Sequence, residues 1–166
     1  MKLQFSDKEL DRLIESATYS AQSQFEQAKT WRLVDWSVSA LAAAFAGVAG
    51  IAQLATDVPA PVLAVLALVA SSLVIVHATL RPEGRYVRGR DAGNAYLSLA
   101  SSARVLRDTC DGLAADECDA TFRGLLAEQR RVNVEAELPF APSFYRGRRN
   151  VRAGYQTYKV DVGDAA

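Results

Sequence analysis

Two adjacent apolar runs decide the fold of this chain: WSVSALAAAFAGVAGIAQLAT at residues 36–56 and VPAPVLAVLALVASSLVIVHATL at residues 58–80, with Asp57 as the single charged residue between them. A segment that crosses a lipid bilayer must satisfy its backbone internally, and about 20 apolar helical residues span the hydrocarbon core. Both runs reach this length. Pro59 and Pro61 favour a tight turn between them, because proline ends one helix and starts another. The sequence therefore predicts a two-pass transmembrane hairpin.

The rest of the sequence is polar. The chain has 166 residues with 19 basic and 19 acidic side chains, and almost all of these charges lie outside the two apolar runs. This partition is typical of a membrane protein with a sizeable water-exposed part. The formal net charge of zero gives no argument for nucleic acid as a partner. A long helical hairpin buried in a soluble protein is the competing interpretation, because the alanine-rich first run favours membrane insertion only marginally.

The placement of arginine and lysine predicts the orientation. Basic residues are retained on the cytoplasmic side of a membrane, and they flank both ends of the hairpin, whereas the connecting turn has none. Lys29 and Arg32 precede the first run. The second run is followed by what we call the juxtamembrane basic belt, namely Arg81, Arg85, Arg88 and Arg90. We therefore expect both termini to be cytoplasmic and the belt to attract anionic membrane lipid. No secretory signal is visible in the first 32 residues.

The predicted fold class is all-α, because no strand pattern is present. Ser6 and Glu9 form a capping-box pattern, which favours the start of a helix. No residue interrupts this helix until about residue 55. We expect one domain over residues 1–166, organised as an N-terminal cytoplasmic helix (6–35), transmembrane helix 1 (36–56), transmembrane helix 2 (58–80) and C-terminal cytoplasmic helices (83–160).

Two apolar stripes predict how the cytoplasmic helices pack, because their residues recur at three- and four-residue steps. The first stripe precedes the hairpin, and the second lies on a helix expected from Arg81-Pro82-Glu83 to about Asp108. Their members are Leu10, Ile14, Ala17, Ala21, Phe25 and Ala28 in the first and Ala92, Tyr96, Leu99, Ala103 and Leu106 in the second. We expect these stripes to pair as a short coiled-coil-like stalk. Two short helices should follow, one at about 117–134 and one from a cap at Ser143 to about Lys159.

Small and polar residues gather on one face of each apolar run. We call these the small faces, which consist of Ser39, Ala43, Ala46, Gly50 and Gln53 in the first run and Ala60, Ala64, Ala67 and Ser71 in the second. Small residues four apart let helix backbones approach closely, which drives association where there is no water to release. We expect the small faces to pack against each other or against neighbouring copies, or to line a narrow path. The bulkier faces, which include Val38 and Phe45, should meet lipid.

Recognisable catalytic motifs are nearly absent from the sequence. The sequence has one histidine, no glycine-rich phosphate loop and no metal-ligand cluster, so we expect no enzyme activity, no metal and no cofactor. The histidine, His77, lies about one turn from the end of the second run. It is either an interfacial residue that reaches headgroups or the stalk, or a gate that responds to pH.

Two further groups of polar residues have ordinary interpretations. Cys110 and Cys118 are expected to be incidental thiols in a reducing compartment, because two cysteines are too few for a disulfide framework. The C-terminal basic cluster is either a solvated helix face or a contact for lipid, for a polyanionic partner or for another copy. It consists of Arg146, Arg148, Arg149 and Arg152.

Several short motifs occur in a defined order after the second apolar run. They are Arg81-Pro82-Glu83, then Arg90 with Tyr96-x-x-Leu99, then Leu138-Pro139-Phe140-Ala141-Pro142 before a tyrosine-bearing helix. Together with the charged N-terminal helix and the two close spans, this order over residues 6–160 resembles the SLATT family (SMODS and SLOG-associating two-transmembrane effector domain). The resemblance implies a membrane-perturbing or pore-forming effector of bacterial nucleotide-signalling and antiphage conflict systems, which provokes cell suicide when a linked sensor fires.

Two functions of different class follow. The first is an oligomeric effector of the bacterial inner membrane, because two spans per chain cannot enclose an aqueous path and several copies must assemble. We expect no sensor domain within these 166 residues, so a separate sensor or nucleotide-signalling protein would supply the trigger. The second is a membrane-anchored scaffold, in which the hairpin is only an anchor and the cytoplasmic helices dock a partner. A small ion channel or transporter subunit is a third interpretation.

Overall fold

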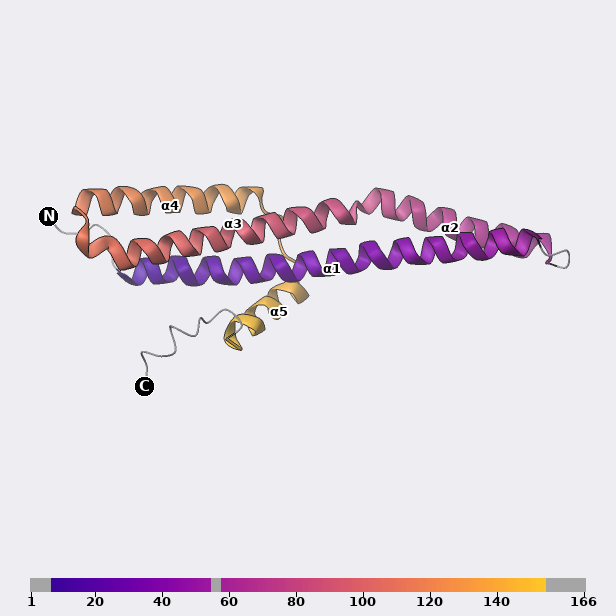
Figure 1. The fold of residues 1–166 in the computed structure, drawn as a ribbon, viewed down its shortest axis with the longest axis horizontal. Helices are drawn as coiled ribbons and strands as arrows, with labels where there is room; N and C mark the ends of the chain where they lie inside the picture. The colour runs from indigo at the N-terminus through magenta and orange to yellow at the C-terminus, as the bar shows by residue number, and fades with distance from the viewer. Residues whose placement is uncertain (1–6, 55–57, 155–166) are drawn as a thin grey trace. The chain divides into compact units, whose positions relative to one another are not determined.

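The computed structural model describes residues 7–54 and 58–154, which form helices joined by short connections. The elements are α1 (Asp7–Leu54), α2 (Ala60–Leu80), α3 (Pro82–Thr109), the short 3-10 helix η1 (Cys110–Gly112), α4 (Ala115–Glu135) and α5 (Ala141–Arg152) (Figure 1). No strand occurs in the two described ranges. The predicted all-α fold class is therefore confirmed.

The helix limits agree closely with the sequence. α1 is continuous over 48 residues, as expected from a stretch without proline. Pro59 is the residue before α2 and Pro82 is the first residue of α3, in keeping with the preference of proline for helix starts. The predicted cap at Ser6, the turn at Asp57 and the continuation of the last helix to Lys159 lie outside the described residues.

The predicted cap at Ser143 is wrong. α5 already begins at Ala141, with Phe140 as the capping residue and Pro142 in its first turn. The fixed backbone angle of proline favours the first turn of a helix, so the helix starts before Ser143 is reached. Ser143 is then only 2% exposed, and it contributes to packing rather than to capping.

The chain divides into two compact units. The hairpin unit comprises Lys29–Tyr86, and the bundle unit comprises the residues before it and those from Val87 onward. The limits of the hairpin unit lie outside those predicted for the two spans. The physical reason is that cationic and aromatic side chains on either side of the apolar runs contact one another. The guanidinium of Arg85 lies 4.7 Å from the ring centre of Trp31, and that of Arg32 lies 5.9 Å from the ring centre of Tyr86.

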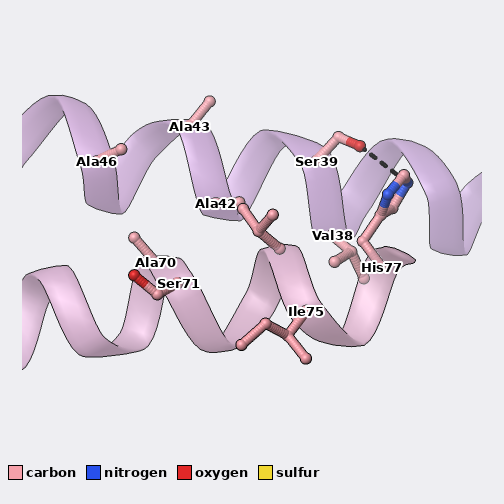
Figure 2. A pocket seen from close by; sticks show the side chains of 10 residues that line it. Val38, Ser39, Ala42, Ala43, Ala46, Ala70, Ser71, Ile75 and His77 are labelled. Carbon is pink, nitrogen blue, oxygen red and sulfur yellow. Dashed lines mark hydrogen bonds between the residues drawn. The ribbon is translucent and has the colours of Figure 1, made fainter. Parts of the chain in front are cut away.

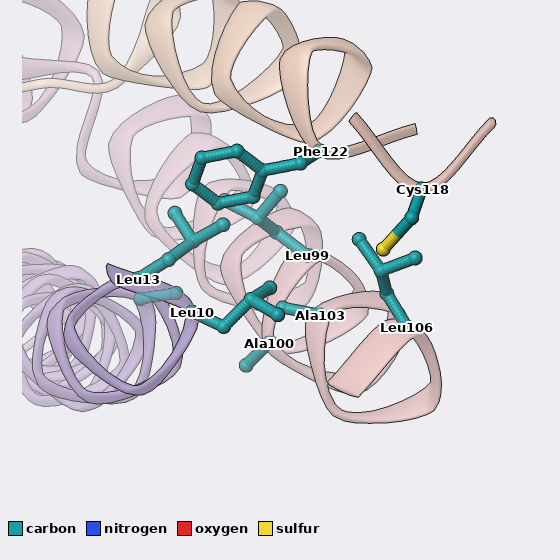
Figure 3. Packing of buried hydrophobic residues seen from close by; sticks show 9 residues of the cluster. Leu10, Leu13, Leu99, Ala100, Ala103, Leu106, Cys118 and Phe122 are labelled. Carbon is teal, nitrogen blue, oxygen red and sulfur yellow. The ribbon is translucent and has the colours of Figure 1, made fainter. Parts of the chain in front are cut away.

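The core of the bundle unit is formed by α1, α3 and α4 (Figure 3). Its buried members are Leu10, Leu13 and Ala17 from α1, Leu99, Ala100, Ala103 and Leu106 from α3, and Cys118 and Phe122 from α4. A second cluster joins Ala21, Tyr96 and Val132. The two predicted stripes thus contribute to one core, as expected for helices whose apolar faces meet. The expected two-helix stalk contains a third helix, because the apolar side of α4 is buried on the same core.

α5 packs on α1 through a close backbone contact. A Cβ atom added to Gly147 would lie 2.7 Å from the backbone nitrogen of Ser23, so only glycine fits there without a shift of the backbone. The Nδ2 atom of Asn150 donates a hydrogen bond of 3.1 Å to Oε1 of Glu26. The Nε2 atom of Gln24 donates another, of 2.7 Å, to the backbone oxygen of Glu137 in the α4–α5 connection. These contacts hold α5 and the segment before it on α1.

Cys110 and Cys118 are joined by a disulfide bond across the α3–α4 connection. Their Cα atoms are 5.7 Å apart, which lies in the usual range for disulfides. The expectation of incidental thiols is thereby corrected. The physical reason is that η1 turns the chain back on itself, so that Cys118, which is buried in the core, faces the end of α3.

Candidate functional site

The hairpin unit contains two helices that are long and apolar enough to cross a membrane. In Figure 1, α2 and the second half of α1 lie side by side and run in opposite directions. The most apolar 18-residue windows of the two helices are 0% and 6% buried within the chain. A hairpin that forms the core of a soluble protein would be mostly covered. The exposure of both windows is compatible with a two-pass membrane hairpin.

The contact between α1 and α2 uses a stripe beside the small faces. Its partly buried members are Val38, Ala42, Phe45, Ala49 and Ala52 on α1 and Leu63, Leu66, Val69 and Leu73 on α2. Their three- and four-residue spacing is typical of helices whose side chains interdigitate. Val38 and Phe45 belong to the face that was expected to meet lipid, so for these two residues the expectation is wrong. The bulky side chains of α1 therefore serve the contact inside the hairpin.

The small faces are exposed along their whole length. All nine members are exposed, namely Ser39, Ala43, Ala46, Gly50, Gln53, Ala60, Ala64, Ala67 and Ser71. A Cβ atom added to Gly50 would meet nothing within 4 Å. Within one chain, then, the two small faces do not pack against each other. Packing against neighbouring copies, and the lining of a path, stay predictions.

Part of both small faces borders one open groove of about 660 Å³ between α1 and α2 (Figure 2). Ser39, Ala43 and Ala46 line it from α1, and Ser71 lines it from α2. Ala70 is 8% exposed between the helices, whereas the small-face residues that line the groove are exposed. The groove therefore brings small residues of two helices, separated in sequence, onto one surface. Gly50, Gln53, Ala60, Ala64 and Ala67 do not line it.

His77 lies at one end of the groove and contacts α1. Its Nε2 atom lies 2.8 Å from Oδ1 of Asp35 and 3.3 Å from Oγ of Ser39, and the second contact is the dashed line in Figure 2. The side chains of His77 and Asp35 are each 34% exposed. The histidine was expected to reach headgroups or the stalk, or to act as a gate. The structure gives it two partners on the neighbouring helix, which makes it a polar link between α1 and α2.

Asp35, His77 and Ser39 have the residue types of a hydrolase triad but not its geometry. In a triad the carboxylate and the hydroxyl contact different nitrogens of the imidazole, so that the ring can take a proton from one side while it is held from the other. Here both contacts involve Nε2. The imidazole therefore does not activate the hydroxyl of Ser39 as a nucleophile. In the described part of the chain, no cluster of His, Cys, Asp and Glu is arranged to hold a metal ion.

Asp35 is the member of this polar contact that the sequence analysis missed. It was given no role in the sequence analysis. A signal was present, since Asp35 and His77 are separated from Asp57 by nearly equal numbers of residues. A hairpin of two regular helices that turns near Asp57 must bring the two residues to the same level.

The juxtamembrane basic belt is largely engaged with other side chains. Arg85 stacks on Trp31, Arg88 pairs with Glu137 at 2.9 Å, and Arg90 pairs with Asp91 at 3.1 Å. Arg81 ends α2 in the left-handed region, with a φ of 46°. Its backbone N–H donates to the carbonyl of His77, which satisfies one of the last carbonyls of α2. Attraction of the belt to anionic lipid stays a prediction.

The chain matches no protein-family model, no curated protein and no solved structure. Its function is therefore argued from three features of the hairpin unit. These are the length and apolarity of the two helices, the exposure of both small faces, and the polar link at the end of the groove. Together they describe a helical pair that has a surface suited to further helix contacts.

Proposed function

We propose that this chain is a two-pass protein of the bacterial inner membrane, with both termini cytoplasmic, whose copies assemble through the small faces into a pore-forming or membrane-perturbing effector. One observation carries the proposal: every residue of the two small faces is exposed. In lipid, an exposed leucine is as well solvated as a buried one. Small residues gain the most van der Waals contact when another helix packs on them, because they let the two backbones approach closely.

Assembly is required by the size of the hairpin. Two helices cannot surround water, so a pore needs several copies. The groove supplies the contact surface, since its small residues leave room for a helix of the next copy. Ser39, Ser71 and His77 add polar atoms to this surface. Intramembrane polar groups of this kind are costly to expose to hydrocarbon and gain from a neighbouring helix or a water-filled path.

The role in antiphage defence comes from the resemblance to the SLATT family. In this proposal the bundle unit holds the assembly in a closed state. A separate sensor or nucleotide-signalling protein shifts the equilibrium to the open state, and it does so only by binding the two states with different affinity. Loss of the membrane potential then kills the infected cell.

A membrane-anchored scaffold is the second candidate. It is favoured by apolar side chains that the bundle unit leaves uncovered around the α4–α5 connection. Val134 is 86% exposed and Leu138 is 91% exposed. Apolar side chains that gather on a polar surface mark sites for protein partners. A scaffold would use these residues, and its hairpin would have no role beyond attachment.

A potential-sensitive dye in bacteria that overexpress the full chain separates the two functions. Overexpression raises the number of assemblies by mass action, and the fraction of them that is open without the sensor depolarises the cells. A chimera in which an unrelated two-span anchor replaces residues 36–80 is the control, and it should leave the potential intact. A normal potential in cells whose membranes contain the intact chain would exclude the effector. Depolarisation by the chimera would exclude a role for the hairpin.

A further inference from the structure

α5 has one side that packs on α1 and another whose large side chains are exposed. Ser143, Gly147 and Asn150, which are four and three residues apart, lie on the packed side. The remaining large side chains are exposed, and we call them the outer face of α5: Phe144, Tyr145, Arg146, Arg148, Arg149 and Arg152. A helix with one packed side and one side of arginines and aromatics is strongly amphipathic.

Among the residues that the structure describes, the arginines of the outer face have no acidic partner. Across residues 7–54 and 58–154, none of the four guanidinium groups takes part in a side-chain hydrogen bond or an ion pair, and α5 itself contains no acidic residue. Other arginines of the bundle unit are paired, as in Arg88 with Glu137 and Arg107 with Asp11. The chain as a whole is formally neutral. The positive charge of α5 is therefore a local excess, which an anionic ligand would neutralise.

Aromatic side chains are interspersed with these arginines. Tyr145 is 67% exposed and Phe144 is 46% exposed, and their rings meet edge to face with centres 6.0 Å apart. Phe140, just before the helix, is 45% exposed. All three side chains are exposed at the surface of the bundle unit rather than buried in its core. Aromatic rings beside arginines are typical of helices that lie in the headgroup layer of a membrane.

We propose that the outer face of α5 binds the anionic surface of a phospholipid bilayer. The guanidinium groups contact lipid phosphates, to which arginine donates paired hydrogen bonds. Tyr145 and Phe144 enter the layer between headgroups and acyl chains. A bilayer surface offers both phosphate and an apolar layer, whereas a soluble acidic protein offers charge without that layer. The inference rests on the membrane location of the proposed function and is independent of pore formation.

Hydrogen–deuterium exchange of the full chain in lipid nanodiscs tests this site. The chain is placed in discs of phosphatidylcholine alone and in discs with an equimolar share of phosphatidylglycerol. The amides of α5 should exchange at least about fivefold more slowly in the anionic discs, the effect of a single arginine at an anionic surface. High salt should reduce the difference, because it screens the attraction. The amides of α4 serve as the internal reference and should not change.

Two sets of variants test whether the lipid effect on exchange depends on the arginines of the outer face or on any exposed arginine. Arg148→Gln combined with Arg149→Gln should abolish the difference in α5 exchange between the neutral and the anionic discs. Arg130→Gln is the matched control, because Arg130 is an exposed arginine of α4, and it should leave the difference unchanged. Unaltered exchange in α1, α3 and α4 will show that the variants are folded.

Three results would overturn the proposal. The first is equal exchange of α5 in neutral and anionic discs, and the second is a lipid difference that survives the double glutamine variant. The third is protection of α5 in neutral discs on addition of a single-stranded oligonucleotide with none on addition of anionic lipid. That result would assign the outer face to nucleic acid.

Discussion

The Nε2 atom of His77 on α2 lies 2.8 Å from Oδ1 of Asp35 on α1, and this contact joins the two helices of the hairpin near one end of their apolar runs. Ser39 adds a second oxygen at 3.3 Å from the same nitrogen. A polar group in apolar surroundings is expensive to leave without a partner. The contact therefore favours one register of α1 against α2, because a shift of either helix would separate the two side chains.

Replacing His77 with leucine should weaken the hairpin. The loss is expected to be about 1 kcal/mol, since both side chains are partly exposed and solvent screens their interaction. Thermal unfolding of the full chain in detergent measures it, as a lowered Tm. Asp35→Asn is the control, because the amide keeps an oxygen that accepts from the ring, and it should lose less. A leucine variant as stable as the parent would show that the contact does not stabilise the hairpin. Unchanged depolarisation by the same variant would dispose of a gating role.

The sequence determines the helices of this protein well, because apolar periodicity and proline mark them directly. The 48 residues of α1, the start of α3 at Pro82 and the two stripes that form the bundle core could all be predicted. The end of each apolar run was equally clear, because a change from apolar to charged residues is visible in any sequence.

The contact face of the hairpin could not be predicted in the same way. On α1 the stripe that includes Val38, Ala42 and Phe45 lies directly beside the small face, and both repeat every three or four residues. Periodicity alone does not say which of two adjacent stripes meets α2. The partner of Cys110 was missed for a related reason, since pairing with Cys118 depends on the turn at η1.

Gly147 offers a test of how α5 docks on α1. Gly147→Ala places a methyl group 2.7 Å from the backbone nitrogen of Ser23, so α5 must shift. We expect a loss of about 1–3 kcal/mol in the free energy of unfolding, typical of overpacking. The control is Gly124→Ala in α4, where an added Cβ meets nothing within 4 Å. That change should stabilise the helix by up to about 1 kcal/mol. Chemical denaturation of both variants checks the pair, and equal effects would contradict the docking contact.

Ionisation of Tyr96 should lower the stability of the bundle at alkaline pH. The ring is 5% exposed, and its hydroxyl donates to Oδ1 of Asn133 at 2.7 Å. Burial raises the pKa of Tyr96 above its usual value of 10.0. Because the folded state favours the neutral phenol, the stabilisation is present below pH 10.0 and is lost as the pH rises through the folded-state pKa.

Above pH 10.0 the free energy of unfolding should therefore fall more steeply in the parent than in Tyr96→Phe, which has no phenol to ionise. At neutral pH the variant should lose about 1 kcal/mol, the value of the hydrogen bond. Denaturation curves at a series of alkaline pH values give both quantities. If the free energy of unfolding falls equally with pH in the parent and in Tyr96→Phe, Tyr96 is not the group responsible.

The disulfide between Cys110 and Cys118 should stabilise the bundle when the protein is oxidised. It closes a short loop, with a sequence separation of 8, for which loop-closure entropy suggests about 2–3 kcal/mol. Reduction with dithiothreitol should therefore lower the Tm of the parent. A variant with both cysteines replaced by serine should melt at the same temperature with and without the reductant. A parent protein that is also insensitive to dithiothreitol would mean that the bond does not contribute.

The molecular mass of the detergent-extracted chain tests most directly whether exposed small faces hold copies together in a membrane. Light scattering that corrects for bound detergent gives this mass for the parent, for Ala46→Leu and for the control Ala44→Leu, which lies two residues away on another side of α1. We predict a multiple of the 18.0 kDa chain mass for the parent and the control, and a smaller particle for Ala46→Leu. A parent that is monomeric, or that dissolves as a monomer without detergent, would contradict assembly through the small faces.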